Sequence, residues 1–448
     1  MKKIITILIF ITAGFKAFAQ LQPNSVQTFK FSIADCINYA NDHQSTVVNA
    51  NLDIKSAEYR VKETIGIGLP QISGQATFTD YLKLPTTLLP GEFLNQPGTF
   101  IPVKFGVNYN SNLTLNASQI IFSGSYLVGL KAAKTYKELS NRNYTRSKID
   151  VDINVTKAYY QVLVSNEQIR LLDANINQLK QQLDQTTAQN KQGFVEKIDV
   201  DRITVQYNNL VTSRENTVRL LALNYQLLKF QMGMPIEYNL TLADKLADVN
   251  IDNNVVAYTT DTTFYHNRIE YGLQETQKNL YALDIKNRIS QYYPSLTANG
   301  SAASAFQNNS FGQLYNSSFP SSYIGLTLNV PIFNGFQRYY QIKQAKITLL
   351  KSQNDLINLK NSLNLQASQA SVNYTNGLQT LNNQKKSQEL AREVLRVSKI
   401  KYQQGVGSSI EVTQAQTALE NADNEYIRGL YDALVSKVDL DRAYGRIK

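Results

Sequence analysis

The fold is organised around a stretch that interrupts a very long helical pattern and occurs twice, Tyr402-Gln-Gln-Gly-Val-Gly-Ser-Ser-Ile-Glu-Val-Thr-Gln-Ala-Gln416. The earlier copy reads Asn190-Lys-Gln-Gly-Phe-Val-Glu-Lys-Ile-Asp-Val-Asp-Arg-Ile-Thr204, and the two align with Gly193 opposite Gly405. In each copy a glycine ends one helix, and a carboxylate a few residues later can begin the next. Both copies therefore predict the tip of a helical hairpin, at about 193–197 and 405–409.

The segment 1–19 has the pattern of a secretory signal peptide. Met1-Lys-Lys is followed by a short apolar run, and Ala17-Phe-Ala19 before Gln20 forms a small-residue cleavage site. No cysteine follows that site closely, which argues against a lipid anchor. Beyond Ala19 no apolar run approaches the roughly 20 residues of a membrane helix. We expect an exported protein that crosses no membrane by helices.

Composition argues against a catalytic, metal-binding or nucleic-acid-binding protein. Cys36 is the single cysteine, so neither an intrachain disulfide nor a cysteine cluster can form. His43 and His266 are isolated, and no cofactor is expected. The net charge is +10, but the basic residues are spread along helical segments, which predicts no nucleic-acid partner. Asp199 and Asp201 point to different helix faces, so we expect no enzyme.

Four segments alternate apolar and polar residues with a period of two, as outer-membrane strands do. In the clearest of them Phe105, Val107 and Tyr109 alternate with lysine and asparagine. A proline-rich loop is expected at 82–103 and a Ser/Asn-rich loop at 307–321. The predicted strands are about 71–81, 104–117, 295–306 and 322–330.

Each pair of strands is followed by a long helical pattern without proline, at about 124–192 and 335–404. At 1.5 Å per residue each of these helices is about 105 Å long. A shorter helix precedes each strand pair and another returns from each tip. Their summed length is close to that of the long helix, so the two short helices should meet head to tail. The predicted short helices are 32–67, 195–232, 263–291 and 408 to the C-terminus.

These elements predict two structural repeats, 20–235 and 263–448, joined by a linker at 236–262 near the midpoint of the helices. Four strands cannot close a barrel, and open strand edges are not tolerated in lipid. Three copies would supply 12 strands. The predicted fold class is mainly α with membrane β: a duplicated helix–strand–strand–long helix–helix unit, with a trimeric 12-stranded β-barrel continued by a long α-helical periplasmic barrel.

The chain resembles the TolC-type outer-membrane efflux protein family over essentially its whole mature length. The resemblance is carried by the duplicated plan, by Ile121-Phe-Ser-Gly124 and Pro331-Ile-Phe-Asn-Gly335 after the strands, and by the two tips. It implies a homotrimer in outer-membrane lipid of a Gram-negative bacterium. It also implies partners: a periplasmic adaptor (membrane fusion protein) and an inner-membrane pump such as a resistance-nodulation-division or ABC transporter.

The resemblance further implies a passive exit channel of a tripartite efflux pump for small molecules. The outer-membrane channel of a type I protein secretion system is the alternative. A non-pore periplasmic coiled-coil adaptor is a more distant one, because adaptors need lipoyl-like and barrel modules for which this chain has no segment.

By position in the family motif, Asp199 and Glu411 would line the closed periplasmic entrance, with Gln414 one helical turn onward. Glu411 could instead be a simple helix N-terminal carboxylate. Gly407 stands where some relatives have a basic residue, and Gln414 where others have a second carboxylate, so their latch bonds are not assumed. Tyr402 could still pair across helices.

Adaptor contact is expected at the tips, where an exposed Phe194 would suit an interface; the alternative is that Phe194 packs across its own turn. Phe122 and Phe333 could brace the corner between barrel and helices, or be ordinary core aromatics. One tip is bulky and charged and the other small, so we expect unequal roles in opening. The predicted tip residues are Gly193, Phe194, Tyr402, Gly405 and Gly407, and the corner residues are Pro70, Phe122, Gly124, Pro294, Pro331, Phe333 and Gly335.

Overall fold

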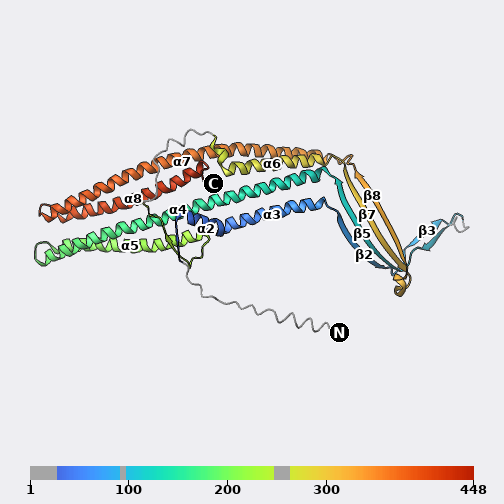
Figure 1. The fold of residues 1–448 in the computed structure, drawn as a ribbon, viewed down its shortest axis with the longest axis horizontal. Coiled ribbons are helices and arrows are strands. Elements are labelled where there is room, and N and C mark those ends of the chain that lie inside the picture. Colours follow the sequence, from blue (N-terminus) through green and yellow to red (C-terminus); the bar gives the residue numbers. More distant parts are fainter. Residues whose placement is uncertain (1–27, 91–96, 247–262, 448) are drawn as a thin grey trace, which may run out of the picture. The chain divides into compact units, whose positions relative to one another are not determined.

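The structure, a computed structural model, describes residues 28–90, 97–246 and 263–447 (Figure 1). The predicted signal peptide and most of the predicted linker lie outside the described residues. The chain forms two compact units. The first, which we call the tip unit, consists of Met1–Gln44, Val151–Asn253 and Gly377–Val435. The second, which we call the sheet unit, consists of Ser45–Asp150, Asn254–Asn376 and Ser436–Lys448. Among the described helices, none combines the length and apolarity needed to cross a membrane.

The sheet unit contains one four-stranded antiparallel sheet in the order β2-β5-β7-β8. Each repeat contributes two neighbouring strands, and the β5–β7 pair joins the repeats. β2 and β8 are the two edges. The strands are β2 (Gln71–Asp80), β5 (Tyr109–Phe122), β7 (Ser295–Asn308) and β8 (Ser318–Asn329).

The pairing register separates the side chains of this sheet into an apolar and a polar face. Leu115 lies opposite Gly74 on one side and Ala302 on the other, so these three share a face. Because alternate residues point to opposite faces, the intervening positions form the second face, which carries amides and hydroxyls. The apolar face includes Ile72, Leu113, Leu115, Leu296, Ile324, Leu326 and Leu328; the polar face includes Gln75, Thr77, Asn112, Thr114, Asn116, Asn299 and Thr327.

Two strand boundaries were predicted wrongly. The strand expected at 104–117 begins at Tyr109, because Gly106 has a left-handed φ of 103° that breaks the extended chain. β8 begins at Ser318, inside the region expected to be a loop, and Pro320 is tolerated there because an edge strand has an unpaired side. The same region holds the short 3₁₀ helix η5 (Phe311–Asn316).

The loop predicted at 82–103 also contains structure. β3 (Thr86–Pro90) and β4 (Phe100–Lys104) pair as an isolated two-stranded hairpin. Pro90 and Pro102, two of the prolines that favoured a loop, sit in these strands. Each strand has an open edge, so a missing N–H there disrupts no second pairing.

The long helices are α4 (Gly124–Lys191), with 68 residues, and α7 (Gln337–Gln403), with 67. Each corresponds to about 100 Å of helix. The return helices are α5 (Lys197–Met232) and α8 (Ser409–Ala443), and the helices that lead into the strands are α3 (Ser45–Ile67) and α6 (Ile269–Ser290).

The helix predicted at 32–67 is interrupted. A capping box, in which Ser32 and Asp35 are bonded reciprocally, begins α2 (Ile33–His43). Gln44 then adopts an extended conformation with a ψ of 124°, so α3 starts as a separate helix. The end of α5 packs against this break: a Cβ on Gly233 would lie 2.7 Å from the carbonyl oxygen of His43.

The return helix of each repeat ends in the same way. Gly233 after α5 and Gly445 after α8 both have left-handed φ values, of 68° and 66°, and they are offset in sequence by the same interval as Gly193 and Gly405. Gly445 packs against the residue pair that precedes α6, with a virtual Cβ 2.9 Å from the carbonyl carbon of Asn267. Each return helix therefore ends against a segment of its own repeat, at His43 and Gln44 in the first and at Asn267 in the second.

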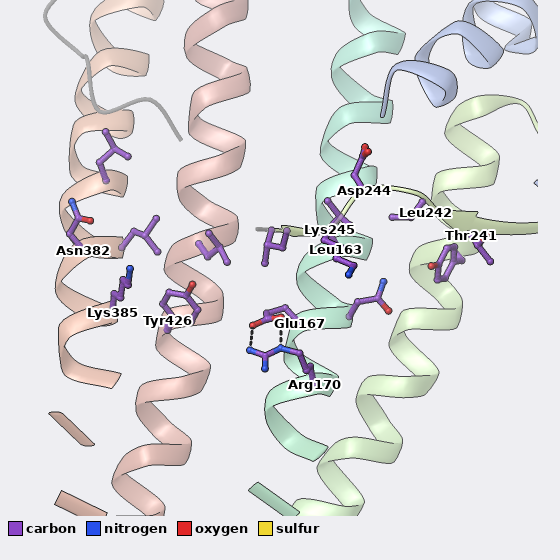
Figure 2. Close-up of a pocket in the computed structure, with 16 residues that line it drawn as sticks. Leu163, Glu167, Arg170, Thr241, Leu242, Asp244, Lys245, Asn382, Lys385 and Tyr426 are labelled. Carbon is purple, nitrogen blue, oxygen red and sulfur yellow. Dashed lines mark hydrogen bonds and ion pairs between the residues drawn. The ribbon is translucent and has the colours of Figure 1, made fainter. Parts of the chain in front are cut away.

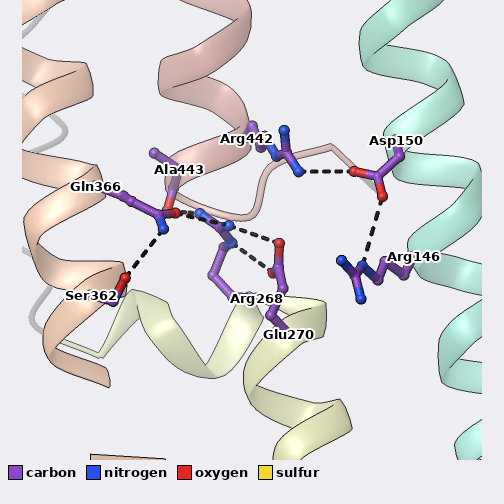
Figure 3. Close-up of polar contacts among 8 residues, drawn as sticks. All are labelled: Arg146, Asp150, Arg268, Glu270, Ser362, Gln366, Arg442 and Ala443. Atoms are coloured by element: carbon purple, nitrogen blue, oxygen red, sulfur yellow. Dashed lines mark hydrogen bonds and ion pairs between the residues drawn. The ribbon is translucent and has the colours of Figure 1, made fainter. Parts of the chain in front are cut away.

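Polar contacts fix the second of these junctions (Figure 3). Arg268 is only 5% exposed; it donates to the carbonyl oxygen of Ala443 at 3.1 Å and forms a two-pronged bond with Glu270. Burial alone would raise the pKa of Glu270, but the Arg268 guanidinium outweighs it and the pKa is lowered. Nearby, Arg442 of α8 bonds Asp150 of α4 at 2.9 Å. A buried cation thus caps the last turn of α8.

A short parallel sheet was not predicted. β1 (Thr28–Phe31) pairs with β6 (Asn239–Leu242), which lies in the predicted linker. Phe29 packs its ring against Tyr238, with centroids 5.7 Å apart. Such short strands carry too little periodic signal to be recognised alone.

Replacing Gly233 by alanine should disturb its junction more than replacing Gly193 disturbs its turn. The left-handed backbone costs a residue with a side chain about 1–2 kcal/mol at either position, but only at Gly233 would the new Cβ also meet backbone atoms. We expect faster amide hydrogen exchange at residues 40–44 and 229–234 in Gly233→Ala. In Gly193→Ala the change should be confined to its turn. Equally mild effects at both sites would contradict the close packing.

Candidate functional site

The two hairpin tips belong to the tip unit and share one backbone design. Gly193 and Gly405 have φ values of 79° and 75°, and no atom lies within 4 Å of where a Cβ would be. The amide of the following residue then donates back to the helix: Phe194 N–H to the Gln189 oxygen and Val406 N–H to the Lys401 oxygen, both at 3.0 Å. These glycines are required by backbone conformation and not by crowding.

Gly407 is required for a different reason. A Cβ at this position would lie 2.9 Å from the Cβ of Lys401 and 3.0 Å from the backbone nitrogen of Tyr402. The second tip therefore turns too tightly for any side chain there.

The two carboxylates proposed for the entrance have different surroundings. The Asp199 side chain is 17% exposed; it accepts a hydrogen bond from Ser409 of the second tip, and Arg202 lies 3.5 Å away. Glu411 is exposed, and its backbone N–H is capped by the Ser408 hydroxyl at 3.2 Å. Asp199 thus ties the two hairpins together, whereas Glu411 presents an exposed charge at the start of α8.

A second polar contact joins the hairpins farther from the tips. Gln206 of α5 donates to the Thr413 carbonyl at 3.3 Å and to the Thr417 hydroxyl at 3.2 Å. Gln414 of the same helix α8 is exposed and takes no part in this contact. Sequence reasoning missed Ser409 and Gln206, because their partners lie in the other repeat and neither carries a charge.

Several buried polar atoms near the tips have no hydrogen bond. Among the described residues these include the Tyr402 hydroxyl and both amide atoms of Gln416. Burial raises the pKa of Tyr402, the Asp199 charge adds to this, and Thr186 opposes it without forming a bond of good geometry. Each unsatisfied buried group costs about 1–3 kcal/mol. The observed packing of the tips is therefore weakly held.

A stronger contact lies farther along the hairpins. Asp423 of α8 accepts hydrogen bonds from Asn175 of α4 at 2.7 Å and from Gln388 of α7 at 2.8 Å. All three side chains are buried. We call this group the Asp423 clamp. Burial, with the Asp423 charge, raises the pKa of the neighbouring Glu420.

Beyond the clamp, apolar packing joins the same helices. Val164 and Leu171 of α4 share a buried cluster with Leu381 of α7 and Leu434 of α8. Nearer the tips each hairpin has its own seam, formed in the first by Leu172, Leu179, Ile203 and Leu210 and in the second by Leu395, Val412, Ala415 and Leu419. The apolar cluster and the clamp therefore join the two hairpins firmly. Toward the tips only the hydrogen bonds of Asp199 and Gln206 described above join them.

A cavity of about 890 Å³ opens between the two hairpins in the tip unit (Figure 2). Its wall comes from α4, α5, α7, α8 and the segment formed by the end of β6 and the residues that follow it. Glu167 and Arg170 on its wall satisfy each other through two hydrogen bonds of 2.6 and 2.8 Å. Nothing in the sequence indicated this cavity, because its lining residues come from five separate segments.

The tips also expose matched apolar side chains. Phe194 is 80% exposed and Val406, its counterpart in the second repeat, is 79% exposed. Ile198 and Ile410 form a second exposed pair. The alternative in which Phe194 packs across its own turn is wrong.

The corner residues flank the strands in the sheet unit. Pro70 and Pro294 immediately precede β2 and β7, and Pro331 follows β8. Gly124 permits close approach of α4 to α6, since its Cβ would lie 3.0 Å from that of Ser290. Gly335 has a left-handed φ of 61°.

The two corner aromatics are not core residues in the single chain. Phe122 and Phe333 are both exposed, and Phe333 packs edge-to-face on Phe336 with centroids 5.5 Å apart. The core alternative is therefore wrong for both. Their exposed rings flank the apolar face of the sheet.

Residues 37–210 and 279–446 match the outer membrane efflux protein family. The chain belongs to this family. Outer membrane protein TolC of Escherichia coli (strain K12) is 24% identical over 366 residues, covering 76% of this chain and 71% of that protein. Proteases secretion protein PrtF of Dickeya chrysanthemi is 21% identical over 354 residues, covering 76% and 73%.

Solved structures of similar fold include the outer membrane protein VceC from Vibrio cholerae and the open state of the Neisseria gonorrhoeae MtrE outer membrane channel. VceC aligns with a TM-score of 0.71 at 15% identity over 92% of this chain and 96% of that one. MtrE aligns with a TM-score of 0.72 at 15% identity over 95% and 93%. As a member of the outer membrane efflux protein family, this chain is an outer-membrane exit channel and not an enzyme.

Removing the carboxylate of the Asp423 clamp should loosen the association of the hairpins. Asp423→Leu leaves two buried amides without an acceptor, at a cost of about 1–3 kcal/mol each, and hydrogen exchange in α8 should rise. Glu425→Leu, on the exposed side of the same helix, is the control and should change little. Equal exchange in the two variants would show that the clamp does not join the helices.

Proposed function

We propose that three copies of this chain form the exit duct of a tripartite efflux pump, receiving small molecules from an inner-membrane pump through a periplasmic adaptor. The supporting observation is the four-stranded sheet, which has two open edges and one face of each polarity. In hydrocarbon, unpaired strand edges are costly enough that a spanning sheet must close on itself.

Three copies would close the sheet into a barrel by pairing their edge strands. β2 of one copy would pair with β8 of the next, giving 12 strands and no free edge. The apolar face, with Ile324 at 93% exposure in the single chain, would meet lipid. The polar face would line a water-filled passage whose walls are neutral amides and hydroxyls, so the strands would not select cargo by charge.

The entrance would lie at the tips, with Asp199, Glu411 and Gln414 around it. The structure supports unequal roles: Asp199 is bound to Ser409, while Glu411 is exposed. In this proposal the Asp199–Ser409 contact keeps the tips together and Glu411 sets the charge of the opening. Contact of an adaptor with the exposed Phe194 and Val406 would separate the weakly joined tips.

Protein secretion is the second candidate, favoured by the similarity to PrtF, whose name states that it secretes proteases. Deleting the gene distinguishes the two functions. Loss of efflux should increase sensitivity to toxic small molecules and leave the set of secreted proteins unchanged. Loss of specific secreted proteins, with unchanged sensitivity, would contradict the efflux proposal. Restoration by the wild-type gene but not by Phe194→Asp would link the tip to partner contact.

Subunit closure can be tested by cysteine crosslinking. The single cysteine is first removed as Cys36→Ser. One cysteine is then fixed as Thr77→Cys on β2, and a second is moved one residue at a time along β8 from Phe319 to Thr327. Because alternate side chains share a face, crosslinked dimers and trimers should recur with a period of two along β8. A monomer at every position would contradict closure by edge pairing.

Single-channel recordings should separate the two carboxylates. Glu411→Ala should weaken block by multivalent cations by about tenfold or more, equivalent to about 1.4 kcal/mol, with little change in open time. Asp199→Ala should instead lengthen openings, because it releases Ser409. Asp201→Ala, an exposed carboxylate two residues on, is the control. Wild-type cation block in Glu411→Ala would show that this residue does not line the entrance.

A further inference from the structure

The connection between β7 and β8 folds back over the apolar face of the sheet and not over the polar one. Phe78, Ser111 and Phe306 lie side by side in the register, and they share the face of Leu113 because Ser111 precedes it by two residues. The helix η5 (Phe311–Asn316) packs on these positions. The Tyr315 ring lies 5.1 Å from that of Phe306, and its hydroxyl is 3.4 Å from the Ser111 hydroxyl.

A second aromatic contact fixes the other end of η5. Phe311 meets Phe78 and Tyr109 edge-on, with centroid distances of 5.9 and 5.7 Å. Leu314, between the two aromatic anchors, is almost fully buried. η5 is thus a packed layer on the apolar face and not a loose loop. We call η5 with Phe78 and Tyr109 the aromatic foot.

The outer surface of the foot remains exposed and aromatic. Phe311 is 61% and Tyr315 59% exposed, and the apolar row continues along the strands from the foot through Leu113 and Leu115. At the opposite end of β5 the chain finishes at the exposed Phe122, and the exposed Phe333 follows the end of β8. The apolar face is therefore bounded by aromatic side chains at both ends.

The separation of the two ends fits a membrane. Tyr109 and Phe122 are the first and last residues of the 14-residue strand β5. At about 3.3 Å per residue they are roughly 43 Å apart along the strand, or roughly 30 Å across a bilayer for a strand tilted by about 45°. Tyr109 and Tyr315 have rings with an apolar body and a polar tip, and such rings favour the boundary between acyl chains and headgroups.

We propose that the aromatic foot binds outer-leaflet lipid at the boundary between acyl chains and headgroups, and so fixes the depth at which the sheet sits in the membrane. The inference rests on the proposed function, in which the apolar face meets lipid. It adds that the β7–β8 connection contacts the membrane. Because η5 lies on the apolar face, it does not cover the polar face that would line the passage.

The absence of tryptophan from the sequence allows a direct test, because any introduced tryptophan is the sole indole in the protein. Tyr315→Trp and Phe311→Trp place it in the foot. Leu115→Trp places it in the middle of the apolar face, and Asn112→Trp on the polar face. Each full-length variant is reconstituted in phosphatidylcholine vesicles whose acyl chains are brominated near the glycerol end or near the methyl end, and is also titrated with iodide.

Tyr315→Trp and Phe311→Trp should be quenched at least about twofold more by bromine near the glycerol end than near the methyl end, as expected at the membrane boundary. Leu115→Trp should show the opposite preference, and Asn112→Trp should respond to iodide only. If both foot variants respond to iodide alone, the foot lies in water and the inference is wrong. If they respond to neither quencher, a neighbouring copy covers the foot and the inference is also wrong.

Leu115→Trp separates this inference from the proposed function. Lipid quenching of Leu115→Trp without quenching of the foot variants would overturn the aromatic foot alone. No lipid quenching of Leu115→Trp would overturn the membrane orientation of the sheet, and the foot with it.

Discussion

Unpaired backbone at the two edges of one sheet is the constraint on which the rest of this protein depends. β2 and β8 each present N–H and C=O groups that no strand in the described part of the chain satisfies. In hydrocarbon such edges must be paired, which is why we propose that several copies of the chain close the sheet together. The duplicated sequence reduces this problem without removing it: β5 and β7, one from each repeat, satisfy each other, and the outer strands are left for neighbouring copies.

The helices follow the same duplicated plan, and glycines occupy equivalent turn positions in the two repeats. Left-handed glycines occur at both tips and at the ends of both return helices, and each pair is separated by the same interval of sequence. The tips differ in what surrounds those turns, since Gly407 is sterically required and Phe194 is exposed. Association of the hairpins is strongest at the apolar cluster and the Asp423 clamp, and weakest at the tips, where buried polar atoms lack partners. This gradient allows a tip to move while the rest of the hairpin pair stays together.

Local patterns of the sequence predicted some elements of this fold and not others. The long periodic helices and the alternating strands were both predicted, because each pattern is formed by residues close together in the sequence. The break at Gln44 was not, because it accompanies the close approach of Gly233, which is distant in sequence. The β1–β6 pair and η5 were also missed, since such short elements are stabilised by packing and not by local periodicity.

The sequence by itself determined the duplicated plan, the lengths of the helices, the positions of the turns and the amphipathic strands. These features depend on local backbone preference and on periodicity, which are properties of short stretches of chain. Only the tertiary structure decided that Asp199 is bound and Glu411 exposed, that Asp423 joins three helices, and that η5 lies on the apolar face. Each of these depends on atoms brought together from distant parts of the sequence, where the burial of a side chain and the identity of its partner are set by packing.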